Sequence, residues 1–330
     1  MKIGKVSQAV LKRSMLKPLQ FKREEALINP TVEEMCFGVG CKEDEDVLIS
    51  ETVLYGDEKN LGVFAIAQAM NDLATRGARM VGASVHIMLP PHAYESRLKA
   101  MMEFSEQAAS THEIQIMCAK AEVSPVITTS IVHLTGIGLV KKGHLIQSCG
   151  GRAEQDVVLL KWIGLEGTFR AMNQKEAELS KRFVPSFLNQ IRQLETEIFS
   201  TEAITIAQEH GASAMQQITS GGILATLWEM AEASDVGLSV DIKKMAIRQE
   251  TVEVCEFCHL NPYLLTSAGS VLIFTDNGEA LIEKYNEVGI QATLLGRTTD
   301  DKARVILGGE EKRFLDKPAA DELLKIYENN

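Results

Sequence analysis

The sequence of 330 residues is poor in aromatic side chains, which make up 5% of it, and it has no run of about 18 apolar residues. A membrane-spanning helix needs such a run, so the sequence predicts no span. Basic residues are also not in excess, because 34 Lys and Arg against 45 Asp and Glu give a net charge of −11. Binding to nucleic-acid phosphates needs a basic surface, which argues against nucleic acid as the main partner.

The N-terminus, "MKIGKVSQAVLKRSMLKPL", lacks the continuous apolar segment and the small-residue cleavage site of a secretory signal. Six cysteines are scattered along the chain, at positions 36, 41, 118, 149, 255 and 258. A chain of this length does not depend on disulfides for stability. We therefore expect free thiols and a cytoplasmic protein.

One cysteine pattern is local. "CEFCH", Cys255 to His259, has the spacing of a c-type haem attachment site, and a zinc site shared with Cys36 and Cys41 is a second interpretation. The simpler alternative is a pair of buried thiols near the end of a helix.

The first half of the chain alternates strands and helices. Strands are expected at 46–55, 79–89, 113–123 and 128–140, and helices at 61–76 and 94–110, with Gly77 ending the first helix. This order predicts an α+β unit with both helices on one face of a sheet. Adjacent apolar residues in the strands indicate burial on both faces, so the second face needs a partner.

The second half follows a polar stretch at 141–156. The apolar stretch 157–165 opens this second unit. A long helical region is expected at about 174–210, and then a strand that runs through a glycine turn into a helix. A strand at 269–276, a helix at 277–289 capped by Asn277, a strand at 290–300 and a hairpin at 302–315 with Gly308–Gly309 as its turn complete the pattern. The sequence thus predicts two tandem units, with domains at 1–150 and 151–330.

The glycine turn reads "TSGG", from Thr219 and Ser220 to Gly221 and Gly222. Two glycines before a helix allow backbone N–H groups to approach an anion, and the helix N-terminus adds partial positive charge. No Lys-Ser/Thr pair follows, so the stretch is not a Walker A loop. The alternative is a tight connection between a strand and a helix.

A second polar feature lies in "AMNDLATRGA", at the end of the helix expected at 61–76. Asn71 lies at the edge of the apolar stripe and Asp72 a quarter-turn further round. A carboxylate beside a core needs a cation, donors or a metal. The simpler alternative places Asp72 in solvent and lets Asn71 bond a loop.

Five segments in this order resemble the AIR synthase (PurM-like) superfamily, which includes thiamine-monophosphate kinase, selenophosphate synthetase and HypE. They are the N-terminal stretch and "MNDLATRGA", "LTGIGLV", "TSGGILATLWEMAEASDVGLSVD" and "CHLNPYLLTSAGSVLI". The resemblance is closest to HypE and the AIR synthase-related proteins. It implies a two-domain PurM-like fold, with an N-terminal ferredoxin-like sheet that forms a barrel in a homodimer and a C-terminal α/β domain.

The resemblance also implies ATP and Mg²⁺ as ligands. By this likeness Asn71 donates to a phosphate, Asp72 holds Mg²⁺ and Glu51 is the other carboxylate near the metal. The remaining phosphate-binding residues implied are Lys120, Thr219, Ser220, Gly221 and Gly222.

The chain departs from the family where carboxylates are usual. Cys41 and Lys42 replace two of them, although the acidic run 43–46 follows, as a substitute or as a solvated loop. Cys118 and Ala119 stand where another Asp is expected, and "QITSGG" lacks the family's Asp and Arg. The chain ends "LLKIYENN", without the terminal Cys that carries the carbamoyl group in HypE.

Three functions remain open at this point. The first is ATP-dependent activation of a small-molecule oxygen with a degenerate metal site. The second is a catalytically weak nucleotide- or metabolite-binding partner protein in a maturation complex, and the third is a structural subunit. The lost carboxylates favour the last two, whereas the retained Asn71, Asp72 and Lys120 and the glycine turn favour an anionic ligand.

Overall fold

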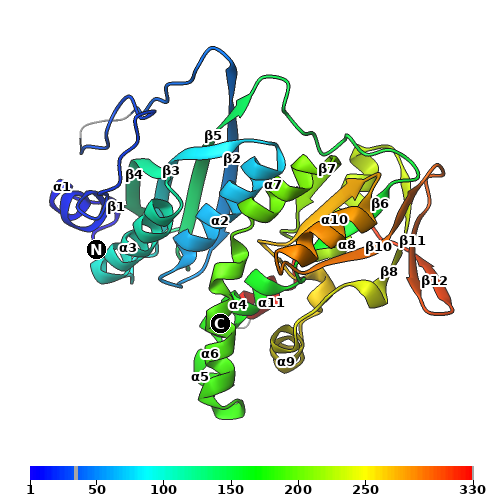
Figure 1. Ribbon diagram of the computed structural model, residues 1–330. Helices are drawn as coiled ribbons and strands as arrows, with labels where there is room; N and C mark the ends of the chain where they lie inside the picture. Colours follow the sequence, from blue (N-terminus) through cyan, green and yellow to red (C-terminus); the bar gives the residue numbers. More distant parts are fainter. Residues whose placement is uncertain (33–35, 329–330) are drawn as a thin grey trace. The chain divides into compact units, whose positions relative to one another are not determined.

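The computed structural model describes residues 1–32 and 36–328 (Figure 1). The chain divides into two compact units: unit 1 is Met1–Leu73 with Ala78–Leu145, and unit 2 is Ala74–Gly77 with Ile146–Asn330. The predicted boundary after residue 150 lies in the same loop as the end of unit 1. Within the described residues, no helix combines the length and apolarity needed to cross a membrane.

Unit 1 is a five-stranded sheet in the order β1-β4-β3-β5-β2, in which only β3 and β4 run parallel. Its strands are β1 (Gly4–Lys5), β2 (Glu45–Tyr55), β3 (Arg79–Leu89), β4 (Gln115–Val123) and β5 (Ile131–Lys141). Its helices are α1 (Gln8–Val10), the π-helix η1 (Leu11–Leu16), α2 (Leu61–Thr75) and α3 (Glu95–Thr111). The order predicted for residues 46–140 is confirmed.

The α2 helix covers one face of this sheet. A Cβ atom added to Gly136 of β5 would lie 3.0 Å from Ala69 of α2, so backbone and helix pack closely there. Gly62 of α2 faces Ser105 of α3 in the same way, and Figure 1 shows the two helices side by side. Gly77 has a φ of 85° and ends α2, as predicted.

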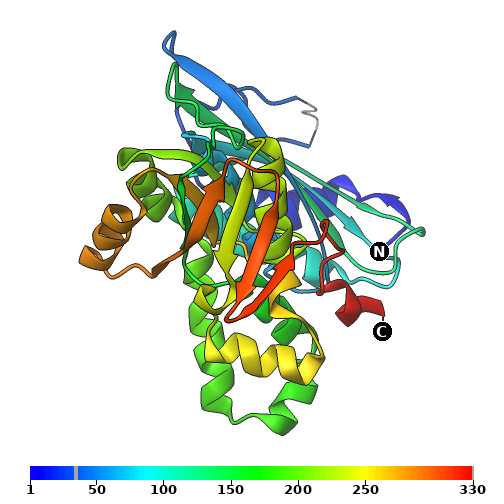
Figure 2. The ribbon, with the colours of Figure 1, turned by 90° about the vertical axis from the view of Figure 1, so that its right-hand side faces the viewer.

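Unit 2 is built on a seven-stranded sheet in the order β12-β11-β8-β10-β6-β9-β7. Its strands are β6 (Asp156–Leu160), β7 (Ala212–Gln217), β8 (Gly237–Asp241), β9 (Val271–Thr275), β10 (Ala292–Thr299), β11 (Arg304–Gly308) and β12 (Glu311–Phe314). Figure 2 shows this sheet from the side of the β11–β12 hairpin. Only β8 and β11 pair in parallel.

Helices cover both faces of the unit 2 sheet. These covering helices are α8 (Gly222–Ala233) on one face and α7 (Thr201–Glu209) and α10 (Gly278–Glu287) on the other. The remaining helices of the unit are α4 (Leu165–Gln174), α5 (Glu176–Arg182), α6 (Pro185–Gln193), α9 (Gln249–Cys258) and α11 (Leu324–Glu328), with 3-10 turns η2 (Leu194–Ile198), η3 (Ile242–Lys244) and η4 (Pro262–Leu264). The β6 strand explains the arrangement. Val157 and Leu159 join the core beneath α8, whereas Val158 and Leu160 join the core beneath α7 and α10.

Several predicted elements of the second half need correction. The helical region expected at 174–210 begins earlier, at Leu165, and is a series of short helices. One of them begins at Pro185, because proline can start a helix but cannot continue one. In the apolar stretch 157–165 that opens the unit, the strand ends at Leu160, and Lys161 takes a φ of 61°. The hairpin turn is Gly309–Glu310, since Gly308 still pairs with Glu311.

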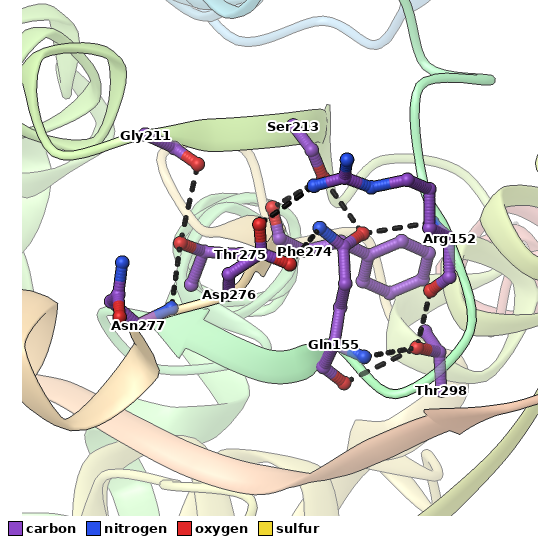
Figure 3. Close-up of polar contacts among 9 residues, drawn as sticks. All are labelled: Arg152, Gln155, Gly211, Ser213, Phe274, Thr275, Asp276, Asn277 and Thr298. Carbon is purple, nitrogen blue, oxygen red and sulfur yellow. Dashed lines mark hydrogen bonds and ion pairs between the residues drawn. The ribbon is translucent and has the colours of Figure 1, made fainter.

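A polar cluster fixes the start of β6 (Figure 3). Gln155 donates from Nε2 to Asp276 at 2.8 Å and accepts at Oε1 from Ser213, also at 2.8 Å. Its N–H donates to Thr298 Oγ1 at 2.8 Å, while Arg152 pairs with Asp276 at 2.6 Å. The cluster thereby joins the segment before β6 to β7, β10 and the end of β9.

The helix that follows this cluster is capped from β6. Asn277 holds the N-cap position of α10, as predicted, but its side chain makes no capping hydrogen bond there. Asp156 instead accepts from the N–H of Gly278 at 2.9 Å, and its other oxygen pairs with Arg297 at 3.1 Å. A carboxylate at this position complements the helix dipole.

Candidate functional site

The predicted glycine turn lies between β7 and α8. Gly221 and Gly222 have φ values of 82° and 67°, both in the left-handed region that side chains rarely adopt. A Cβ atom on Gly222 would lie 2.4 Å from the carbonyl oxygen of Tyr263. The turn therefore requires glycine at 222, and its backbone lies directly against the 263–265 segment.

The turn holds a carboxylate from the same unit. The N–H of Gly221 donates to Oδ2 of Asp321 at 2.9 Å, and the N–H of Leu323 donates to Oδ1 at 2.8 Å. Asp321 is 6% exposed. Its burial raises the pKa of the carboxyl to about 6, although both N–H groups act in the opposite direction.

A buried ion pair lies near this carboxylate. Glu166 and Arg170 of α4 are 0% and 3% exposed, and their side chains meet at 3.2 Å. Thr266 donates to Glu166 at 2.7 Å, and Arg170 reaches the hydroxyl of Tyr327 at 3.4 Å. Glu166 raises the pKa of Asp321 and Arg170 lowers it, so the three side chains share one electrostatic environment.

The segment that carries Asp321 is held at further points. We call residues 319–327 the C-terminal strap. Glu322 accepts from the N–H of Asn261 at 2.9 Å, and its own N–H donates to the carbonyl of Leu264 at 3.2 Å. Leu323 and Ile326 are buried. The strap therefore lies along the same 261–265 segment that touches Gly222.

A cavity of about 240 Å³ lies beside the turn. Leu224 and Ala225 of α8, Tyr263 and the stretch that leads into the strap line it, and this stretch includes Arg313 and Lys317. The lining also includes Asp316, so it carries two cations and one anion next to a helix N-terminus, and this balance favours an anionic ligand.

In unit 1 we call the sheet face opposite α2 the outer face. It carries two of the predicted ligand residues, Lys120 and Glu51. Strand register places Val53, His133, His86 and Lys120 in one row across β2, β5, β3 and β4. Burial lowers the pKa of His86, and His133 and Lys120 add to this effect. Glu51 lies one row further on and approaches His133 to 3.9 Å.

Asn71 and Asp72 lie at the end of α2, on the side opposite Lys120. Asn71 is fully buried, and Asp72 is half-buried and accepts a hydrogen bond from Ser50 at 3.4 Å. Ser50 pairs with Gly136, which faces α2, so its neighbour Glu51 points to the outer face. Unit 1 thus brings Lys120 and Glu51 to one face and Asp72 to the other.

Two family models match most of the chain. The AIR synthase related protein N-terminal domain matches residues 44–140, and the AIR synthase related protein C-terminal domain matches residues 152–308. The chain belongs to the AIR synthase-related family. The predicted PurM-like two-domain fold is confirmed.

Two curated relatives place the chain near the hydrogenase-maturation branch of the AIR synthase-related family. A putative hydrogenase expression/formation protein of Methanocaldococcus jannaschii is 24% identical over 332 residues, which cover 98% of this chain and 97% of the relative. The carbamoyl dehydratase HypE of Cupriavidus necator is 24% identical over 81% of this chain and 76% of its own length.

Solved structures agree on the fold of this AIR synthase-related protein. E. coli HypE aligns with a TM-score of 0.79 at 19% identity, over 97% of this chain and all of that chain. A HypE in complex with ATP aligns with a TM-score of 0.73 at 16% identity, over 96% of each chain. A HypE–HypF complex aligns with a TM-score of 0.66 at 20% identity, over 82% of this chain and 90% of that one.

The predicted metal ligands fit Mg²⁺ only in part. Glu51 and Asp72 point to opposite faces of the sheet, so in unit 1 they do not ligate one ion together. In the described ranges 1–32 and 36–328, no three His, Cys, Asp or Glu side chains gather as a metal site. Mg²⁺ is often held by one carboxylate together with substrate phosphates, and Asp72 suits that arrangement.

The cysteine pattern at Cys255–His259 closes α9. Cys255 is buried, and burial raises the pKa of its thiol to about 12 and that of Cys258 to about 11. A metal ligand has to be a thiolate, which this environment disfavours. Cys36 and Cys41 are exposed. The end of α9 therefore carries one buried thiol, Cys255, and one half-buried thiol, Cys258, which is close to the simpler alternative.

The sequence did not predict three residues at or near the glycine turn, which are Glu166, Arg170 and Asp321. The spacing of Glu166 and Arg170, four residues apart in "LEGTFR", is the pattern of a helical ion pair and was the available signal. Asp321 carries no such signal, because its partner Gly221 lies 100 residues away in sequence.

Proposed function

We propose that this protein binds ATP with its phosphates at the Gly221–Gly222 turn and uses it to activate an oxygen of a small molecule. The observation that carries the proposal is the carboxylate of Asp321 on the Gly221 N–H, because it indicates that the turn accepts an anionic oxygen. Membership of the AIR synthase-related family supports it, as does the fold shared with a HypE that was crystallised with ATP.

The remaining ligands of the nucleotide are proposed from the family likeness. Thr219 and Ser220 would add hydroxyls beside the turn, and Asn71 would donate to a phosphate from the α2 side of the unit 1 sheet. Lys120 lies on the opposite face of that sheet, so it is not proposed to donate to the same group. Asp72 would hold a Mg²⁺ ion that the phosphates also ligate, and such an ion would neutralise charge on the nucleotide. Thr219 is half-buried and Ser220 is exposed, so both hydroxyls are near the surface.

The site also supports a second function, that of a nucleotide-binding partner protein with little turnover. The row Glu51–Thr135–Ser84–Cys118 crosses the outer face and contains one carboxylate, with Cys118 where the family has Asp. Fewer carboxylates leave a triphosphate less well oriented for phosphoryl transfer. A maturation-factor partner fits this function, and a HypE has been crystallised with HypF.

We further propose a homodimer formed through the outer face. Val47, Ile49 and Val53 of the edge strand β2 are 46%, 66% and 58% exposed on that face. A row of exposed apolar side chains on an edge strand favours pairing with another chain. The family's barrel, in which two such sheets meet, accounts for this pattern.

Calorimetry with ATP, with and without Mg²⁺, tests the proposed ligand. Wild type and Thr219→Val are compared, with Thr205→Val in α7 as a matched exposed control. We expect micromolar binding to wild type, unchanged in the control and several-fold weaker in Thr219→Val. Absence of any ATP heat or melting shift in wild type would refute the proposed function.

Turnover separates the two functions. Release of phosphate from ATP at rates of about 1 s⁻¹ in the presence of a cell-extract metabolite pool would support the enzyme, since kinases reach 1–100 s⁻¹. Tight ATP binding with no phosphate release above the background rate would favour the binding-partner function.

A further inference from the structure

The glycine turn already holds an anionic group from its own chain. Asp321 places one carboxylate oxygen 2.9 Å from the Gly221 N–H, next to the N-terminus of the 12-residue helix α8. This is the geometry that a phosphate oxygen takes at such a turn. The position is thus filled by a group of the charge and size expected of the ligand.

The strap also covers the turn sterically. A Cβ atom on Gly221 would meet the carbonyl oxygen of Ala319 at 3.0 Å, so strap backbone lies directly over this residue. A phosphate oxygen and the Asp321 carboxylate cannot both occupy the same N–H. Two adjacent anions would in addition repel each other in a buried setting.

The strap is held by contacts that do not involve the turn. Leu323 and Ile326 are 1% and 4% exposed, and Glu322 bonds the backbone of the 261–264 segment from both its side chain and its N–H. Asp321 can therefore leave the turn while Leu323 and Ile326 keep the rest of the strap docked, or the strap can leave as a whole.

We propose that the C-terminal strap is an autoinhibitory contact in which Asp321 occupies the place of a ligand phosphate at Gly221. This inference rests on the proposed function, because it assumes that the turn binds the nucleotide. Binding then requires displacement of Asp321, and the measured affinity is lower than the affinity of the open turn by the fraction of molecules that are open.

The charged side chains around Asp321 affect how tightly its carboxylate binds to the turn. Glu166 repels the carboxylate and Arg170 attracts it, both from α4, while Gly221 and Leu323 donate N–H groups. Neighbouring Glu322 pairs with Lys325 at 2.7 Å. A buried carboxylate that is partly repelled by Glu166 is displaced more easily than one that faces cations alone.

The test measures binding of ATP and of tripolyphosphate, a probe without the nucleoside, to full-length protein. The variants are Asp321→Ala, which removes the carboxyl group from the turn, and the control Asp300→Ala, which changes an exposed carboxylate between β10 and β11. We expect Asp321→Ala to bind both probes about ten-fold more tightly than wild type and Asp300→Ala to match wild type. Addition of either probe to wild type should speed hydrogen exchange at the Leu323 amide.

A second variant guards against local misfolding in the first. Leu323→Asp places a charge at a buried position of the strap and should release the strap from the turn. The affinity for ATP and tripolyphosphate should then rise about ten-fold, as in the first variant. Binding of equal strength in wild type and both variants would overturn the inference and leave the proposed function intact. Weaker binding in Asp321→Ala would identify a structural cap and also overturn the inference. No binding in any protein would refute both proposals.

Discussion

At the scale of single residues, glycines with a left-handed backbone differ in what surrounds them. Gly222 has a φ of 67° and no room for a Cβ atom, whereas Gly289, after α10, has a φ of 72° and nothing within 4 Å. The two positions share their backbone conformation and differ in contact. The comparison therefore separates conformational strain from steric exclusion at the site.

Gly222→Ala should destabilise the protein by about 3 kcal/mol or more, because it adds a clash with the Tyr263 carbonyl to the cost of a left-handed alanine. Gly289→Ala pays only the conformational cost, about 1 kcal/mol. Urea unfolding of both variants measures the difference. Equal losses would mean that the 263–265 segment moves aside freely and that the turn is not rigid.

Asp72 is the second residue whose role a single change can settle. Asp72→Asn is nearly isosteric and keeps an acceptor for Ser50, so melting without ligand should change by less than about 1 kcal/mol. If Asp72 meets Mg²⁺ on the nucleotide, the variant should lose the Mg²⁺-dependent part of the ATP-induced melting shift. A shift of wild-type size in the variant would remove this role.

At the scale of elements, the strap, α4 and the turn before α8 form one polar assembly. Its polar groups come from three segments that are far apart in the sequence, near residues 166, 221 and 321. Each segment alone makes only a few of the hydrogen bonds and ion pairs in the assembly. Binding of the strap is linked to protonation of Asp321, whose pKa rises from 3.8 to about 6 when it is buried at the turn. A carboxyl with a raised pKa binds its proton more readily in the docked state, so low pH favours docking.

Docking should therefore weaken as pH rises from about 4 to 6 and become independent of pH above that range. Hydrogen exchange of the Leu323 amide, corrected for the intrinsic rate and measured in dilute protein, reports the change. We expect protection to fall by roughly ten-fold across this interval. Asp321→Ala should show a flat profile, and a flat profile in wild type would contradict the assigned linkage.

Local sequence patterns predicted the elements better than the assembly. The strands and helices of residues 46–140 were predictable because alternating and helical apolar patterns repeat over 9 to 17 residues in each. The short strand β8, five residues with Ser239 half-buried, carries too little pattern to be recognised. Gly221 and Gly222 were predictable as a glycine turn between a strand and a helix. The contact with Asp321 was not, because it depends on packing between residues 100 positions apart in the sequence.

At the scale of the whole molecule, both units are built on mixed sheets, yet their surfaces differ. The unit 2 sheet is covered by helices on both faces, while the outer face of unit 1 keeps Ile49 and its neighbours exposed. An apolar edge strand of this length on a monomer promotes aggregation unless a partner covers it. The homodimer proposed above would satisfy this requirement.

Light scattering at micromolar concentration should give about twice the chain mass of 36.3 kDa. Ile49→Lys puts a charge at the centre of the exposed row and should yield monomers with unchanged secondary structure. Val288→Lys, which alters an exposed apolar residue of unit 2, is the control and should remain dimeric. A monomeric wild type would rule out the dimer.

The place of β6 in its sheet has a consequence for how the chain acquires its structure during synthesis. This strand is the first of unit 2 to be made, yet both of its neighbours in the sheet are made much later, β9 at Val271–Thr275 and β10 at Ala292–Thr299. More than a hundred residues must therefore leave the ribosome before β6 can pair. Such high contact order slows folding, so unit 1 should already be compact while the nascent unit 2, with its Val157–Leu160 core strand unpaired, still depends on chaperones.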